Sequence, residues 1–237
     1  MTNHTTNLHA RLWDIANTLR GKMGADEFRD YILGFIFYKY LSEKMNSYAD
    51  ELLRPDGLTY MQLKERTAQG DEYLAAIRGE ALDKLGYFLQ PSELFGELAR
   101  RGDAGGSEQF ILDDLQEVLR SIERSTMGTE SEDDFGNLFE DLDLTSSKLG
   151  KSENDKNALV VKVMAHLEQI DFRLEDAESD LLGDAYEYLI GQFASNAGKK
   201  AGEFYTPQEV SSILAKIVTT GKTRLRSVYD PTCGSGS

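Results

Sequence analysis

The stretch "RLRSVYDPTCGSGS" (224–237) joins a short apolar run to a glycine-rich loop, and it decides which fold class the rest of the chain must fit. "RLRSVYD" predicts a β-strand that ends at Asp230. The glycines of "GSG" allow close approach of the backbone to a ligand, as in the first turn of a nucleotide-binding α/β unit. No Gly-Lys-Ser/Thr sequence follows, so the loop is not a phosphate-cradling P-loop. The stretch therefore predicts the first strand and turn of an α/β domain.

Upstream of this stretch, apolar residues recur mainly at helical spacing. The pattern predicts helices near residues 8–19, 26–45, 92–101, 107–122, 152–167 and 181–193. Gly34 lies inside the second helix, where we expect close packing against a neighbour. Residues 1–170 are thus predicted to form a mainly α helical N-terminal domain. Residues 171–237 are predicted to be the start of an incomplete α/β, Rossmann-like domain.

Composition limits the class of protein. The chain has 237 residues, of which 40% are hydrophobic, so it can bury a core. It shows no stretch long and apolar enough to span a membrane, and its start lacks the pattern of a signal peptide. The single cysteine, Cys233, excludes a disulfide within the chain, and the three histidines are unclustered, which predicts no metal site. These features favour a cytoplasmic setting.

The charge distribution is uneven. The net charge of −15 argues against a chain that coats nucleic acid by itself. Between Met127 and Lys148 there are seven acidic residues and no basic one, a composition typical of a solvated loop. From Gly198 to Tyr229 there are six basic residues and two acidic ones. Only the C-terminal part is therefore suited electrostatically to phosphates.

The segment "GEFYTPQEV" (202–210) has the features of a helix start. Thr206 is a good N-cap, Pro207 fits the first helical position and Glu209 the third. Apolar residues at helical spacing follow as far as Gly221. Any stable helix can begin in this way, and that interpretation stays open. The alternative is that Phe204 and Tyr205 form a wall for a planar or charged ligand beside the helix N-terminus.

Taken together, "LLGDAYEYLIGQFASNAGKKAGEFYTPQEV" (181–210) and "VYDPTCGSGS" (228–237) resemble the modification (methyltransferase) subunit of type I restriction–modification systems. The stretches "RDYILGFIFYKYLSEKM" (29–45), "YFLQPSELFGEL" (87–98) and "FGNLFEDLDLTSSKLG" (135–150) resemble the N-terminal domain of the same family. The resemblance thus covers nearly the whole chain. It implies an enzyme that uses S-adenosyl-L-methionine to methylate the N6 amino group of adenine in DNA.

The resemblance also implies roles for individual residues. The cofactor pocket would be lined by Glu203, Phe204, Tyr205, Thr206, Pro207 and Gln208, and by Asp230, Pro231, Cys233, Gly234, Ser235 and Gly236. Asp230 would lie beside the amino acid portion of the cofactor, and the loop that follows would pass beneath it. Lys199 and Lys200 are candidates for contacts with DNA phosphates, although an exposed glycine-flanked loop explains them equally well.

One departure from the family pattern limits the expected activity. The catalytic Asn/Asp-Pro-Pro-Phe/Tyr motif, which holds the adenine after it leaves the base stack, does not occur here. Nor does the acidic residue expected to hold the cofactor ribose. We therefore expect the chain to be the N-terminal part of a longer enzyme and to be inactive alone. Two alternatives stay open: a non-catalytic helical module that binds other subunits, and part of a self-contained adenine methyltransferase.

The resemblance further implies partners. In the family, a separate specificity subunit reads the double-stranded DNA, a second modification subunit completes the clamp around it, and a restriction (nuclease) subunit can join them. We expect these partners here, and no association with a membrane.

Overall fold

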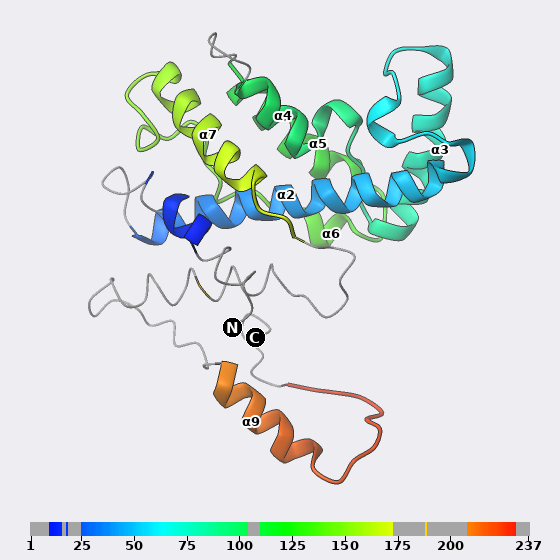
Figure 1. Cartoon of the computed structure of the whole chain (residues 1–237), viewed down its shortest axis with the longest axis vertical. Helices are drawn as coiled ribbons and strands as arrows, with labels where there is room; N and C mark the ends of the chain where they lie inside the picture. The colour runs from blue at the N-terminus through cyan, green and yellow to red at the C-terminus, as the bar shows by residue number, and fades with distance from the viewer. Residues whose placement is uncertain are drawn as a thin grey trace. The chain divides into compact units, whose positions relative to one another are not determined.

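The computed structural model describes residues 10–15, 18, 25–103, 110–172, 188 and 208–230. The chain divides into two units, Met1–Ile190 and Gly191–Ser237. Helices of the first unit include α2 (Ala25–Leu53), α3 (Ala68–Leu85), α4 (Phe95–Gly102), α5 (Leu112–Ser125), α6 (Glu132–Phe135) and α7 (Glu153–Glu168). Its short 3-10 helices include η1 (Arg54–Asp56), η2 (Tyr60–Gln62) and η3 (Pro91–Glu93). The described helix of the second unit is α9 (Gln208–Thr219) (Figure 1).

Helix α2 is the axis of the first unit. It packs against η1, η2, α3, α4 and α7, and α4 also packs against α7 (Figure 1). Of the apolar positions predicted from its spacing, Ile32, Phe35, Ile36, Leu41 and Met45 are in the core, each at most 3% exposed. The side chain of Phe28, also predicted, lies outside the described part of the chain. Burial of this stripe is the main favourable term for the unit, at about 25 cal/mol for each Å² removed from water. The mainly helical part of the predicted fold class is confirmed.

Gly34 has the close neighbour predicted for it. A Cβ atom at this position would lie 3.3 Å from Leu142 Cδ2. That separation is tighter than most contacts of a Cβ atom, so a larger side chain would displace Leu142. The glycine therefore allows α2 to approach the segment that carries Leu142.

Three buried tyrosines of the first unit donate hydrogen bonds to backbone carbonyls far away in the sequence. These bonds join Tyr38 to Glu93 O (2.6 Å), Tyr87 to Leu41 O (2.8 Å) and Tyr60 to Leu89 O. Each ring adds apolar area to the core while its hydroxyl satisfies a backbone carbonyl. Together they hold the segment 86–94 against α2 and η2.

Serine side chains complete this attachment. The N–H of Phe95, the first residue of α4, donates to Ser42 Oγ on α2 at 2.7 Å. The N–H of Phe88 donates to Ser125 Oγ, at the end of α5, at 3.0 Å. Both serines are buried, so each satisfies a backbone donor that could not reach water.

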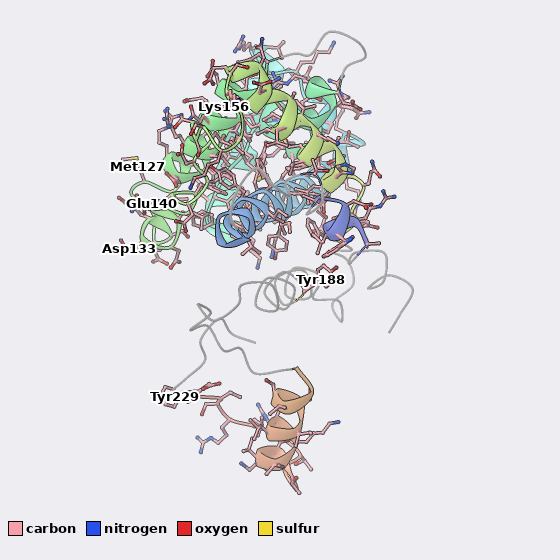
Figure 2. All side chains as sticks on the ribbon, turned by 90° about the vertical axis from the view of Figure 1, so that its left-hand side faces the viewer. Met127, Asp133, Glu140, Lys156, Tyr188 and Tyr229 are labelled. Atoms are coloured by element: carbon pink, nitrogen blue, oxygen red, sulfur yellow. The ribbon has the colours of Figure 1, made fainter. Side chains whose placement is uncertain are left out.

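The acidic segment between Met127 and Lys148 follows α5 as turns and the short α6. Its seven acidic side chains are exposed: Glu130, Glu132, Asp133, Asp134, Glu140, Asp141 and Asp143. Figure 2 shows Asp133 and Glu140 at the edge of the helical unit. The solvated interpretation of this segment is confirmed.

Candidate functional site

The best-described part of the predicted cofactor site is the helix that follows Thr206 and Pro207. Helix α9 begins at Gln208 and ends at Thr219, and Gly221 beyond it has a φ of +75°. A positive φ after the last turn is the usual way for a glycine to end a helix. The helix predicted from the Thr-Pro start is therefore confirmed in the described residues.

The apolar face of α9 is open to solvent. Its large apolar residues are between 43% and 64% exposed: Val210, Ile213, Leu214, Ile217 and Val218. Leaving so many large apolar side chains in water on one helix is unfavourable, and a contiguous patch of this kind marks a surface that another element or molecule covers. Sequence periodicity identified the face, but it did not identify what packs on it.

The strand predicted over residues 224–230 is not confirmed. These residues are described, and they form no strand. A strand exists only through hydrogen bonds to a neighbouring strand, and no strand occurs anywhere in the described ranges to pair with this segment. The Rossmann-like start therefore stays a prediction. Asp230, at the end of the segment, is exposed.

The other predicted site residues lie outside the described part of the chain. These are Glu203, Phe204, Tyr205, Thr206, Pro207, Pro231, Cys233, Gly234, Ser235 and Gly236, and the DNA-contact candidates Lys199 and Lys200. The backbone of Gln208 is described as the first residue of α9. The predicted helix at 181–193 also falls outside, apart from Tyr188, which is helical.

In the first unit, a charged centre lies where α2, α4 and α7 meet. Its cation is Lys39, whose side chain is only 3% exposed. The ammonium group pairs with Glu43 one turn along α2 and lies 3.6 Å from Glu168 Oε2 at the end of α7. It also lies 5.6 Å from the ring centre of Phe95 and 5.5 Å from that of Phe172. Two carboxylates and two aromatic faces thus compensate a cation that has been removed from water.

Burial raises the pKa of the Glu43 carboxyl, and the adjacent Lys39 opposes this by lowering it. The like charges of Glu168 and Asp171 add to the rise, and burial is the largest influence on this pKa. The sequence carries a local signal for this centre, because Lys39 interrupts the apolar stretch 31–41 and an acidic residue follows four positions later. From the sequence alone, Lys39 indicated only that the stretch 31–41 does not span a membrane. The buried charged centre could not be predicted, because Glu168, Phe95 and Phe172 come from distant segments.

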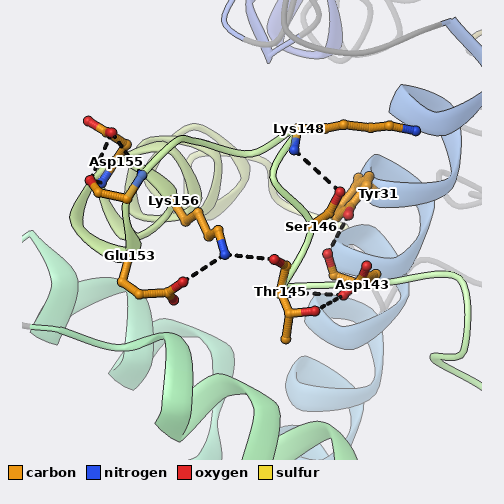
Figure 3. A network of polar contacts seen from close by, with 9 residues as sticks. Tyr31, Asp143, Thr145, Ser146, Lys148, Glu153, Asp155 and Lys156 are labelled. Atoms are coloured by element: carbon orange, nitrogen blue, oxygen red, sulfur yellow. Dashed lines mark hydrogen bonds and ion pairs between the residues drawn. The ribbon is translucent and has the colours of Figure 1, made fainter.

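A second polar network anchors the loop before α7 (Figure 3). Lys156, on α7, donates to the carbonyl of Thr145 at 2.6 Å and pairs with Glu153 at 2.7 Å. The hydroxyl of Tyr31, on α2, donates to the carbonyl of Asp143. Because the lysine and the tyrosine come from different helices, residues 143–145 of the loop are attached to both α7 and α2. Its role in the described structure is to join α2 to α7.

The same loop ends in the helix start predicted from Ser152. Ser152 accepts the Asp155 N–H at 3.2 Å, and the Asp155 carboxylate accepts the Ser152 N–H at 3.1 Å. This reciprocal pair is a capping box, in which two backbone donors are satisfied by side chains. The predicted N-cap is confirmed.

Two negative findings concern the described ranges. They contain no group of three or more His, Cys, Asp or Glu side chains that could hold a metal ion. Nor does any helix in them combine the length and apolar character that crossing a membrane requires.

The fold and the motifs define a class of protein. In this class, a helical domain is followed in the chain by a helix that begins directly after a Thr-Pro pair. Residues 8–167 match the family model described as "HsdM N-terminal domain", and residues 177–237 match the model "N-6 DNA Methylase". Because the first match covers more than half of the chain, the protein belongs to the HsdM N-terminal domain family. The resemblance drawn from the motifs is confirmed at this level.

Relatives give the same picture. The chain is 31% identical over its whole length to the type I restriction enzyme MpnII methylase subunit of Mycoplasma pneumoniae, of which it covers 44%. It is 24% identical over 98% of its length to the MjaIX methylase subunit of Methanocaldococcus jannaschii, of which it covers 38%. The chain thus spans less than half the length of these relatives.

A solved structure is also similar. It is the type I restriction-modification system methyltransferase subunit from Streptococcus thermophilus, with a TM-score of 0.73 and 39% sequence identity. The match covers 92% of this chain and 44% of the other.

Proposed function

We propose that the protein is the modification subunit of a type I restriction–modification system. In this role it transfers a methyl group from S-adenosyl-L-methionine to the N6 amino group of adenine in double-stranded DNA. The observation that carries the proposal is the order of the two family matches: an HsdM N-terminal domain over 8–167 and an N-6 DNA methylase over 177–237. The names of the relatives support the same activity. A cytoplasmic location follows from it.

The cofactor would supply the methyl group on its sulfonium sulfur. Its binding residues would be Glu203, Phe204, Tyr205, Thr206, Pro207, Gln208, Asp230, Pro231, Cys233, Gly234, Ser235 and Gly236. The residues present suit such a ligand chemically: the exposed Asp230 carboxylate can accept hydrogen bonds from an ammonium group, and the glycines permit close backbone approach. Residues 1–170 would form the helical domain, and 171–237 the start of the methyltransferase domain.

The proposal includes partners. A specificity subunit would select the DNA sequence, a second modification subunit would complete the clamp, and a nuclease subunit would add restriction. Lys199 and Lys200 would contact DNA phosphates. This chain lacks the Asn/Asp-Pro-Pro-Phe/Tyr motif, so methyl transfer would need residues that the longer relatives carry beyond the matched region.

The test uses a polypeptide extended to the length of the relatives and combined with its specificity subunit. We expect labelled methyl groups to move from S-adenosyl-L-methionine to N6 of adenine in double-stranded DNA. Asp230→Ala should abolish cofactor binding in calorimetry, whereas Glu72→Gln, on the exposed side of α3, should leave it unchanged. Transfer to another acceptor, or to none, would reject the activity.

A second candidate is a non-catalytic module that binds other subunits, and the exposed apolar face of α9 favours it. The same calorimetry separates the two. Tight association with a specificity subunit by an extended polypeptide that binds no cofactor would favour the module.

A further inference from the structure

A cavity of about 630 Å³ lies in the first unit, beside the loop that precedes α7. Its walls include residues 147–151 of this loop, together with Thr18. One face of α7 forms the rest of the lining, with Asp155, Ala158, Leu159 and Lys162 at helical spacing. The cavity is separate in sequence from all residues proposed to bind the cofactor.

The charged side chains of this cavity are mostly basic. Lys148, Lys151 and Lys162 line it, against the one carboxylate of Asp155. That carboxylate is engaged, because it accepts hydrogen bonds from the N–H and the hydroxyl of Ser152 in the capping box. The lining thus has an excess of two positive charges, in a chain whose net charge is −15.

Folding brings these charges together, whereas the linear sequence does not. Lys148 and Lys151 come soon after the acidic segment, and Lys162 lies eleven residues further along the chain. The charge pattern of the sequence therefore predicted phosphate contacts only in the C-terminal part. Because the loop packs beside α7, the structure places all three lysines around one cavity and adds a second basic surface to the protein.

Two of the three ammonium groups are available to a ligand. In the described part of the chain, Lys151 and Lys162 are exposed, and their side chains take part in no ion pair or hydrogen bond. Lys156 differs, because it is buried and is held by Glu153 and by the carbonyl of Thr145. The network that fixes the loop (Figure 3) therefore leaves the charges of Lys151 and Lys162 uncompensated.

The spacing of the lysines suits an extended run of phosphates. Lys151 directly precedes the N-cap of α7, and Lys162 lies about three turns further along the helix, so the two positions are about 15 Å apart along its axis. Each strand of a DNA duplex carries one phosphate about every 3.4 Å of its axis. A duplex that lies along α7 would bring several phosphates to these exposed side chains without entering an enclosed site.

From this geometry we propose that the basic surface formed by Lys148, Lys151 and Lys162 contacts the phosphate backbone of double-stranded DNA. The inference rests on the proposed function, which independently supplies this polyanion as the substrate, and it gives the helical domain a direct part in holding it. The contacts are electrostatic and do not depend on base sequence. Because the exposed acidic side chains between Glu130 and Asp143 repel phosphates, the contact is confined to the basic surface.

The test measures binding of a fluorescent random-sequence duplex at several salt concentrations. The protein is a polypeptide extended to the length of the relatives and assembled with its specificity subunit. Each phosphate contact contributes about 0.9 to the slope of log K against log salt concentration. Combining Lys151→Gln with Lys162→Gln should therefore make the slope shallower by about 1.8 for each modification subunit that contacts the duplex. Lys162→Arg, which keeps the charge, should retain the wild-type slope.

The matched control combines Lys64→Gln with Lys84→Gln, which removes the same charge from exposed positions outside the cavity and should leave the slope unchanged. Equal changes in the two double variants would show a general effect of net charge and overturn the proposal, as would an unchanged slope in the variant of Lys151 and Lys162. If this variant instead failed to assemble with its partner subunits in sedimentation without DNA, the surface would bind protein, and the proposal would also be wrong.

Methyl transfer by the wild-type complex is measured separately. Its absence, or a wild-type complex that binds no duplex, would reject the proposed function and this inference with it. Methyl transfer together with an unchanged salt slope in the lysine variant would reject this inference alone. The two failures are therefore distinguishable.

Discussion

At the scale of single residues, the helical unit depends on glycines that let two segments approach closely. Gly34 on α2 lies against Leu142, and Gly96 on α4 leaves room for Glu168. Lys39 is the opposite case, a charged side chain in the core that two carboxylates and two rings compensate. Each of these residues acts through contacts with a segment distant in sequence.

We predict that Gly34→Ala stabilises the protein less than Gly79→Ala. Both glycines lie inside helices, so both changes gain the same helix propensity of up to about 1 kcal/mol. The added methyl group at 79 meets open space, whereas at 34 it meets Leu142 at 3.3 Å. Urea unfolding followed by circular dichroism measures both variants. Equal gains in the free energy of unfolding would contradict a close contact at Gly34.

At the scale of elements, side chains in the first unit hydrogen-bond to backbone groups at helix starts and in loops, and so hold these segments in place. The capping box of Ser152 and Asp155 begins α7, and Lys156 fixes the loop before it to the carbonyl of Thr145. Helix α9 differs, because its apolar face is exposed. The apolar face of α7 is thus buried, whereas that of α9 is open to solvent.

We predict that Ser152→Ala lowers the free energy of unfolding by about 1 kcal/mol, because the Asp155 N–H loses its acceptor. Ser152→Asp should retain most of the stability, since a carboxylate caps as well as a hydroxyl. Chemical denaturation of the three proteins tests this. A similar loss in both variants would mean that the cap contributes little.

We predict that Ile213→Lys reduces self-association and the fluorescence of a hydrophobic dye bound to the 237-residue chain. Ile213 is 57% exposed on the apolar face of α9, and a charge there would interrupt the patch. Ser212→Lys, on the same helix at an exposed polar position, is the matched control and should change neither signal. Equal effects of the two substitutions would show that net charge, not the apolar face, governs association.

At the scale of the whole molecule, buried tyrosines link stability to pH. Burial raises the pKa of Tyr38, Tyr60 and Tyr87 above the ordinary tyrosine value of about 10. In the unfolded chain these hydroxyls lose their protons near pH 10, while in the folded chain they keep them. The folded state therefore binds more protons above that pH, and stability falls as pH rises.

We predict that ionisation of these three tyrosines does not affect the free energy of unfolding below about pH 10. Above that pH, the free energy of unfolding declines as pH rises. Denaturant titrations between neutral and strongly alkaline pH measure the decline, and tyrosinate absorbance reports ionisation. Tyr60→Phe should lower stability at neutral pH, through the lost bond to Leu89, and make the alkaline slope shallower. An unchanged slope would show that Tyr60 ionises equally in both states.

Much of the helical unit was predictable because its signals are local. Helical spacing predicted the buried stripe of α2, serine before an apolar run predicted the start of α7, and a run of acids predicted an exposed segment. The strand at 224–230 was predicted from equally local signals, but a strand needs hydrogen bonds to another strand, and the described ranges contain none. Of the predicted cofactor site, the helix after Pro207 is confirmed, and the residues around it stay a prediction.

By itself, the sequence determined that most of the first unit is helical, where α7 begins and which family the motifs resemble, because these depend on neighbours a few positions apart. Helix α3 (Ala68–Leu85) was not predicted from the sequence. Only the tertiary structure decided that Lys39 is buried between Glu43, Glu168 and two rings. The physical reason is that the burial of Lys39, and most of its charge compensation, depend on segments far apart in sequence, as Lys39 and Glu168 are, which no local pattern brings together.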